Sequence, residues 1–159
     1  MASITGLFHG GITVRDMDVA LRFYVEGLGL KVHIDRVIEA PYLKGPSGVL
    51  GLDFDDIRVV YLRVPNTDSF VELLEYRGVE RLSAAARPCD FGGGHICLYV
   101  DDVDAMHDRL VSMGYRARSA GPRGITSGPN KGARSVYMRD PDGNKLCALF
   151  MGGEPSEAS

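Results

Sequence analysis

Hydrophobic and polar residues alternate over four short stretches in the first half of the chain, and this alternation predicts β-strands. The four stretches cover residues 7–14, 30–37, 57–64 and 69–76. Between the first two, Asp16 or Asp18 can cap a helix that ends near Gly27 and Gly29 and covers the apolar face of the first strand. The stretch 38–56, which is rich in Gly and Pro, is predicted to be a wide loop.

The same order of elements returns in the second half. Strands are predicted at residues 95–100, 115–119, 134–139 and 145–150. Apolar residues at helical spacing between Val103 and Met113 predict a helix that ends at Gly114. A second Gly- and Pro-rich loop is predicted at 120–132, a linker at 77–91 and a disordered tail at 152–159.

Two fixed offsets indicate that the chain contains a duplication. His9 and His95 are 86 positions apart, and the same offset relates Val14, Asp16 and Asp18 to Val100, Asp102 and Asp104. At an offset of 76, the segment 58–65 corresponds to the segment 134–141. We therefore expect an α+β fold made of two βαβββ modules, residues 6–76 and 92–151, within one domain.

Composition and charge exclude some classes of function. A net charge of −3 and a pI near 5.8 lack the basic excess that nucleic-acid binding uses. The sequence has no run of about 18 apolar residues, and its first residues lack the layout of a secretory signal. The three cysteines form no CxxC pair. We expect a soluble, cytoplasmic protein with no nucleic-acid or membrane partner.

One carboxylate is placed where only a cation or a metal ion would stabilise it. In the strand 69–76, Glu72 shares a face with Phe70 and Leu74, so it is predicted to be buried. His9 and His95 occupy equivalent first-strand positions in the two modules. Two histidines and one carboxylate suit a divalent Fe, Mn, Co, Ni or Zn ion and leave coordination positions open for substrate.

Other side chains are candidates by strand alternation. Thr13 shares the face of His9, and Tyr99 shares that of His95, so both are predicted to contact substrate. The phenol of Tyr137 could polarise a substrate oxygen or carry a proton. Arg134 belongs to a group of basic residues around the second loop that could bind an anionic substrate.

Four short motifs carry a resemblance to a known family. They are His9-Gly10-Gly11-Ile12-Thr13-Val14, Val71-Glu72-Leu73-Leu74-Glu75, His95 ahead of Val100-Asp101-Asp102, and Asp140-Pro141-Asp142-Gly143-Asn144. In these the chain resembles the vicinal oxygen chelate superfamily, which includes glyoxalase I, methylmalonyl-CoA epimerase, bleomycin resistance proteins and extradiol dioxygenases. The resemblance implies two βαβββ modules whose mixed sheets curl into a cup around one divalent metal ion, and a homodimer.

The resemblance also implies roles for particular residues. His9, Glu72 and His95 match three metal ligands of the glyoxalase and epimerase branches. The fourth ligand position falls on Cys147, where those branches usually have a glutamate that also takes part in proton transfer. Glu72, Tyr137 and Cys147 are therefore the candidate catalytic residues, with Cys147 as a ligand, a catalytic group or a small apolar filler.

Three functions remain open from the sequence. The first is a metal-dependent isomerase or lyase that stabilises an enediolate of a small oxygenated substrate. The second is an Fe(II)-dependent dioxygenase that cleaves a catechol-like ring. The third is a protein without catalytic activity that binds a drug or an aromatic molecule, as bleomycin resistance proteins do.

Overall fold

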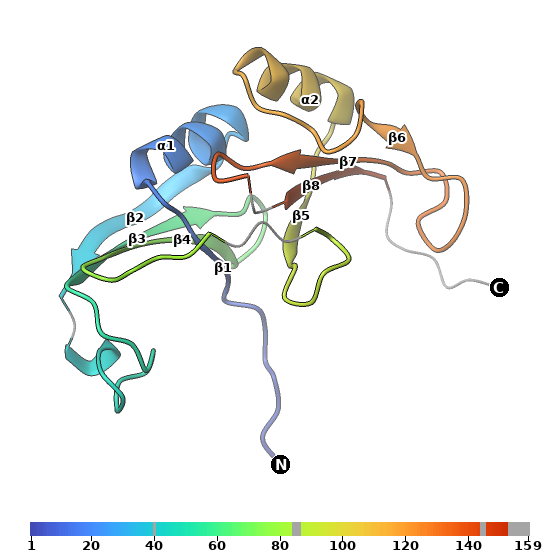
Figure 1. Cartoon of the computed structure of the whole chain (residues 1–159). Coiled ribbons are helices and arrows are strands. Elements are labelled where there is room, and N and C mark those ends of the chain that lie inside the picture. The colour runs from blue at the N-terminus through green and yellow to red at the C-terminus, as the bar shows by residue number, and fades with distance from the viewer. Residues whose placement is uncertain (40, 84–86, 144–145, 153–159) are drawn as a thin grey trace. The chain divides into compact units, whose positions relative to one another are not determined.

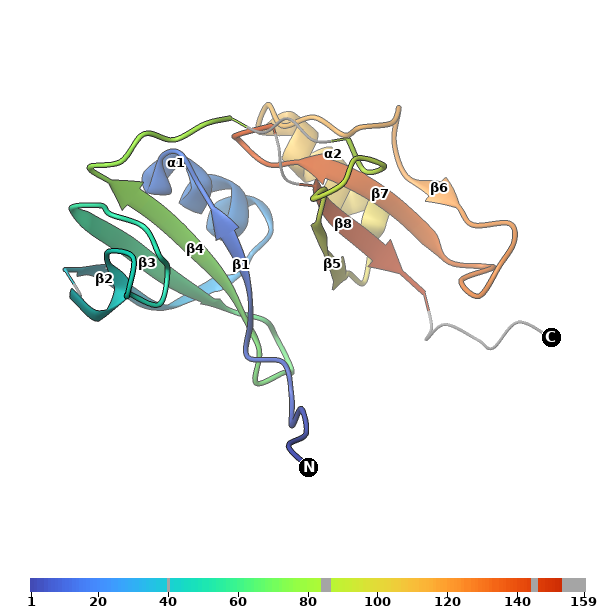
Figure 2. The same ribbon diagram turned by 60° about the horizontal axis from the view of Figure 1, so that its bottom comes forward.

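The computed structural model describes residues 1–39, 41–83, 87–143 and 146–152, without the side chains of 146–148. The predicted tail beyond residue 152 lies outside this description. The chain forms two compact units, Met1–Leu82 and Ser83–Ser159, and Figures 1 and 2 show one sheet in each unit. In the described ranges, no helix combines the length and apolar composition that a membrane span requires.

The first unit follows the strand, helix and three-strand order predicted from the sequence. Its elements are β1 (His9–Thr13), α1 (Met17–Leu21), the π-helical turn η1 (Arg22–Gly27), β2 (Lys31–Ile38), the 3₁₀ turn η2 (Pro41–Leu43), β3 (Asp56–Arg63) and β4 (Phe70–Arg77). The strand order in the sheet is β1-β4-β3-β2. β1 runs parallel to β4, and the other neighbours are antiparallel.

The second unit repeats this topology with the order β5-β8-β7-β6. Its elements are β5 (His95–Tyr99), α2 (Val103–Ser112), β6 (Arg123–Gly124), β7 (Arg134–Arg139) and β8 (Leu146–Met151). The prediction of a strand over residues 115–119 is wrong. Residues 116–118 form only two backbone hydrogen bonds to β7, and the edge strand is β6, inside the predicted loop 120–132.

Each sheet buries one face against its helix (Figure 1). In the first unit the covered face consists of alternate apolar residues that are at most 7% exposed: Ile12, Val60, Leu62, Val71 and Leu73. In the second unit Val136, Met138 and Leu149 are buried in the same way, together with Val103 and Leu110 of α2. On its opposite face the first sheet carries a second buried cluster, which includes Phe54, Ile57 and Val59, beside the positions of Tyr61 and Glu72.

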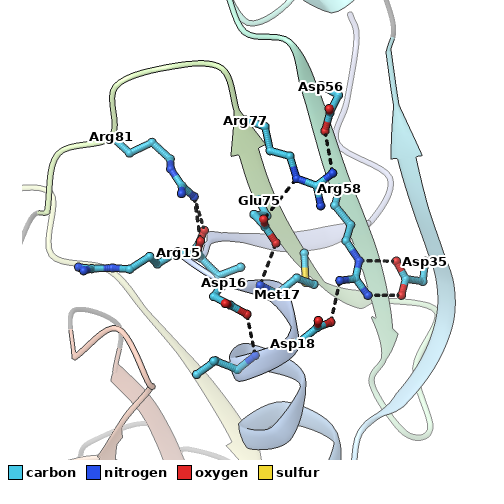
Figure 3. Close-up of polar contacts among 12 residues, drawn as sticks. Arg15, Asp16, Met17, Asp18, Asp35, Asp56, Arg58, Glu75, Arg77 and Arg81 are labelled. Atoms are coloured by element: carbon cyan, nitrogen blue, oxygen red, sulfur yellow. Dashed lines mark hydrogen bonds and ion pairs between the residues drawn. The ribbon is translucent and has the colours of Figure 1, made fainter.

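Polar contacts fasten α1 to the first sheet (Figure 3). Asp16 caps the helix by accepting a hydrogen bond from the backbone N–H of Val19 at 3.0 Å. The carboxylate of Glu75 on β4 accepts a hydrogen bond from the backbone N–H of Met17 at 2.9 Å. Arg58 on β3 pairs with Asp18 at 2.7 Å and with Asp35 on β2 at 2.8 Å. The start of the helix is thereby tied to three strands.

The second unit repeats part of this fastening with residues at the offsets found in the sequence. Asp102 accepts a hydrogen bond from the backbone N–H of Ala105 at 2.9 Å and so caps α2. Arg134 on β7 pairs with Asp104 on α2 at 2.6 Å, as Arg58 pairs with Asp18. The duplication is therefore preserved in the contacts between helix and sheet.

The Arg58–Asp35 pair predicts a pH-dependent contribution to stability. Hydrogen bonds from Arg58 lower the pKa of Asp35, so this contribution is present above the ordinary carboxyl pKa and is lost as the pH falls below about 4. Asp35→Asn is expected to lower the free energy of unfolding at pH 7 by about 0.5–1 kcal/mol, a value reduced by solvent exposure of the pair. Urea unfolding at pH 7 and pH 3 measures the difference.

The difference in urea midpoint between the parent and Asp35→Asn should be smaller at pH 3 than at pH 7, because the contribution declines as the pH falls through the lowered pKa of Asp35. Asp68→Asn, in an exposed turn, is the control and should leave the midpoint unchanged at both pH values. An Asp35→Asn effect of equal size at pH 7 and pH 3 would contradict the assignment.

Candidate functional site

The first unit brings His9 and Glu72 together on the face of its sheet that α1 does not cover, hereafter the open face. Glu72 is the register partner of Gly11 on β1 and of Tyr61 on β3. The Nε2 atom of His9 lies 3.1 Å from Oε2 of Glu72. Glu72 is only 9% exposed, so the burial predicted from strand alternation is observed.

Tyrosine side chains surround the Glu72 carboxylate. Burial raises the pKa of Tyr61 to about 12, with further contributions from a hydrogen bond to Glu72 and from its charge. Burial and the charge of Glu72 also raise the pKa of Tyr76. Burial and the charge of Glu72 therefore both favour the protonated form of the two phenols. Within the described ranges no Lys or Arg pairs with Glu72.

The His9–Glu72 pair has features that suit a divalent metal ion. An imidazole nitrogen and a carboxylate oxygen, here 3.1 Å apart, are donor atoms that divalent transition metals bind. A buried carboxylate without a Lys or Arg partner gains most from a bound cation. A Cβ atom at Gly11 would lie 3.3 Å from Oε2 of Glu72, so glycine keeps space beside the carboxylate. These residues fit a metal ion.

A complete ligand set is not assembled within the part of the chain that the structure describes. No three side chains of His, Cys, Asp or Glu gather there into a group that could hold a metal ion. His9 and Glu72 belong to the first unit, and His95 belongs to the second.

In the second unit His95 lies beside Tyr137. The Nε2 atom of His95 is 3.4 Å from the phenol oxygen of Tyr137, and the two rings are edge to face at 5.1 Å. Tyr137 corresponds to Tyr61 at the offset of 76. Tyr99 is 67% exposed, and its ring packs against Phe150.

The register of β8 bears on the fourth position, which the resemblance assigned to Cys147. In the first unit Glu72 is paired with Tyr61, and the equivalent Tyr137 is paired with Ala148. Cys147 is instead paired with Met138 and Ile96, and its side chain lies outside the described residues. By register the position equivalent to Glu72 is therefore Ala148, not Cys147. Neither residue supplies a carboxylate.

The structure does not bring Arg134 to this group. On β7, Arg134 lies on the same face as the buried Val136 and Met138, and Tyr137 lies on the opposite face. Arg134 donates two hydrogen bonds to Asp104, at 2.6 and 2.9 Å. It therefore fastens α2. Thr13 is exposed at the end of β1 and is the register partner of Leu74, on the side of the strand that carries His9.

Sequence reasoning missed several residues on the open face of the first unit. The rings of Phe8, Tyr61 and Phe70 contact one another at centroid distances between 5.7 and 5.9 Å, and Phe8 lies 4.8 Å from His9. Tyr61 could have been found from its correspondence with Tyr137. Phe8 precedes β1 and is 60% exposed, so strand alternation does not decide its direction.

Two proteins similar to this chain in sequence have names that describe enzymes. The chain is 33% identical over 142 residues to a 2-epi-5-epi-valiolone epimerase from Actinomyces sp, covering 87% of this chain and 75% of that protein. It is 30% identical over 151 residues to a probable chloroplastic lactoylglutathione lyase from Arabidopsis thaliana, covering 94% of this chain but 37% of that protein.

A solved structure has a similar fold. A glyoxalase family protein from Bacillus cereus superposes with a TM-score of 0.76 at 19% identity, covering 96% of this chain and 97% of that one. The family model described as Glyoxalase/Bleomycin resistance protein/Dioxygenase superfamily matches residues 6–148. Since this match extends over nearly the whole chain and agrees with the two mixed sheets, the chain belongs to the glyoxalase/bleomycin resistance protein/dioxygenase superfamily.

Proposed function

We propose that this chain is a divalent-metal-dependent enzyme that carries out epimerase- or lyase-type chemistry on a small oxygenated substrate. The observation that carries the proposal is the buried Glu72 carboxylate, which contacts Nε2 of His9 and has no Lys or Arg partner in the described ranges. Two relatives that are at least 30% identical are named as an epimerase and a probable lyase, which supports this class of reaction.

His9 and Glu72 are the proposed ligands that the structure holds next to each other. His95 is the third proposed ligand, and it rests on the duplication and on the family resemblance. A divalent ion held by these residues would act as a Lewis acid that stabilises negative charge on adjacent substrate oxygens. The metal could be Fe, Mn, Co, Ni or Zn, since all suit two histidines and one carboxylate.

The protein's own groups supply the proton chemistry in this proposal. Epimerisation beside a carbonyl removes a proton from carbon, moves the C–H electron pair toward the carbonyl oxygen as an enediolate, and returns a proton to the opposite side of the same carbon. Glu72 is the proposed acceptor of the proton that leaves carbon. In the second unit, where positions 147 and 148 carry no carboxylate, the phenol of Tyr137 lies beside His95, and Tyr137 is the proposed donor of the proton that is returned.

Metal content provides the first test. Purified protein is expected to contain about one divalent ion per chain by elemental analysis, and His9→Ala, Glu72→Ala and His95→Ala are each expected to lose most of it because a ligand atom is removed. His107→Ala is the control, since His107 lies on α2 and hydrogen-bonds to Asp108, and it should retain the metal.

Circular dichroism of each variant separates loss of a ligand from loss of the fold. Protein that takes up none of the five metals under loading would contradict the proposal. So would a folded Glu72→Ala variant with undiminished metal.

Proton exchange provides the second test. In D₂O the metal-loaded protein is expected to exchange the hydrogen beside the carbonyl of small α-hydroxy ketones, which ¹H NMR detects. Tyr137→Phe removes the proposed proton donor and is expected to slow the exchange by about 100-fold while leaving the metal content unchanged. Tyr115→Phe, at a residue that follows the end of α2, should exchange at the parent rate.

Unchanged exchange in Tyr137→Phe would contradict the role of that residue. If no ketone in a broad panel exchanges, the reaction class is wrong. Oxygen uptake with a catechol by the Fe(II)-loaded protein would then support ring cleavage instead.

A further inference from the structure

A β-bulge places an additional imidazole on the open face of the first unit. In the ladder between β2 and β3, Val32 is paired with Leu62 and Ile34 with Tyr61, so His33 is an extra residue in β2. A bulge of this kind redirects a side chain. The ring of His33 stacks on Phe70 of β4, with centroids 5.1 Å apart and an interplanar angle of 26°.

Arg63 completes a compact group with these two rings. Its guanidinium lies 4.8 Å from the centroid of Phe70, and its Nη2 atom is 3.4 Å from Nδ1 of His33. Because a guanidinium only donates, Nδ1 of His33 accepts and Nε2 carries the proton. Arg63 and His33 therefore both present N–H donors, on a shared aromatic support.

The charge of this group is unbalanced. Lys31 on β2 is the register partner of Arg63, so two cations face each other across the ladder. Counting only the described residues, Lys31, His33 and Arg63 have no carboxylate partner. Like charges directly opposite each other destabilise a sheet, and an anion between them would relieve that repulsion.

The group lies close to the proposed ligand pair. Phe70 is the register partner of both His9 and Arg63, so His9 and Arg63 are two strands apart, about 10 Å between backbones. The rings of Tyr61 and Phe70, whose centroids are 5.7 Å apart, lie between His9 and Arg63. A small molecule on these rings could place one end at His9 and Glu72 and the other at Arg63.

We infer that Arg63 and His33, supported by Phe70 and assisted by Lys31, bind an oxyanion, a phosphate or a carboxylate, carried by the substrate. The inference rests on the proposed function, because that function places the other end of the substrate at His9 and Glu72. It narrows the substrate class to small oxygenated molecules with an anionic substituent a few bonds from the oxygens that approach His9 and Glu72.

The test uses inorganic phosphate and acetate as separate probes on the full chain. NMR titration of the His33 imidazole is expected to show a saturable shift with at least one of them, and the preferred anion distinguishes phosphate from carboxylate. Arg63→Gln removes charge-assisted hydrogen bonds and is expected to weaken binding by about tenfold.

Arg139→Gln is the matched control. Arg139 corresponds to Arg63 at the offset of 76, and its neighbour on β8 is Leu146 rather than an aromatic residue. The variant has the same net charge as Arg63→Gln and should bind like the parent. Equal weakening in both variants, or a linear shift without saturation for both anions, would overturn the inference.

Glu72→Gln separates this inference from the proposed function. It leaves Arg63 and His33 in place, so anion binding should persist even if the variant has lost its metal and its exchange activity. If the parent protein binds phosphate or acetate but exchanges no ketone, the anion subsite stands and the proposed reaction fails.

Discussion

The burial of alternate strand residues against a helix is the constraint on which the rest of the structure depends. Because side chains alternate across a strand, packing one face of each sheet under α1 or α2 decides which residues emerge on the other face. A slip of one residue in β4 would exchange the buried Leu73 for Glu72 beneath the helix. The apolar core therefore selects the orientation of Glu72 and, with it, the chemistry of the open face.

The Glu72 carboxylate imposes a second requirement on its surroundings. Burying a carboxylate without a Lys or Arg partner costs free energy. Among the described residues, the neighbours of Glu72 are an imidazole and phenols rather than a Lys or Arg. Glycine at position 11 leaves room beside the carboxylate. A carboxylate with such neighbours remains able to bind a cation.

The sequence predicted the features that depend on periodicity, and it did not predict those that depend on a single backbone step. Alternation placed Glu72 correctly, and the repeated aspartates marked both helix caps. The bulge at His33 was not predicted, because polar and apolar residues keep alternating from Lys31 to Asp35 in the sequence, whereas the extra residue reverses the faces on which Ile34 and Asp35 lie. The family resemblance put the fourth ligand position at Cys147, whereas the backbone ladder between β7 and β8 pairs Tyr137 with Ala148.

Arg58 pairs with Asp18 in the first unit, and Arg134 pairs with Asp104 in the second. This repeated pairing shows that the two faces of the duplicated sheets differ in how far the copies resemble each other. Both copies keep the fastening on the helix side, while the opposite faces have diverged: one carries a glutamate opposite a tyrosine, and the other carries an alanine at the same place in the ladder. Substitutions on the opposite face of a module could therefore change that face without disrupting the packing of the helix on the sheet. A duplicated scaffold of this kind lets one copy conserve an old site while the other acquires new specificity.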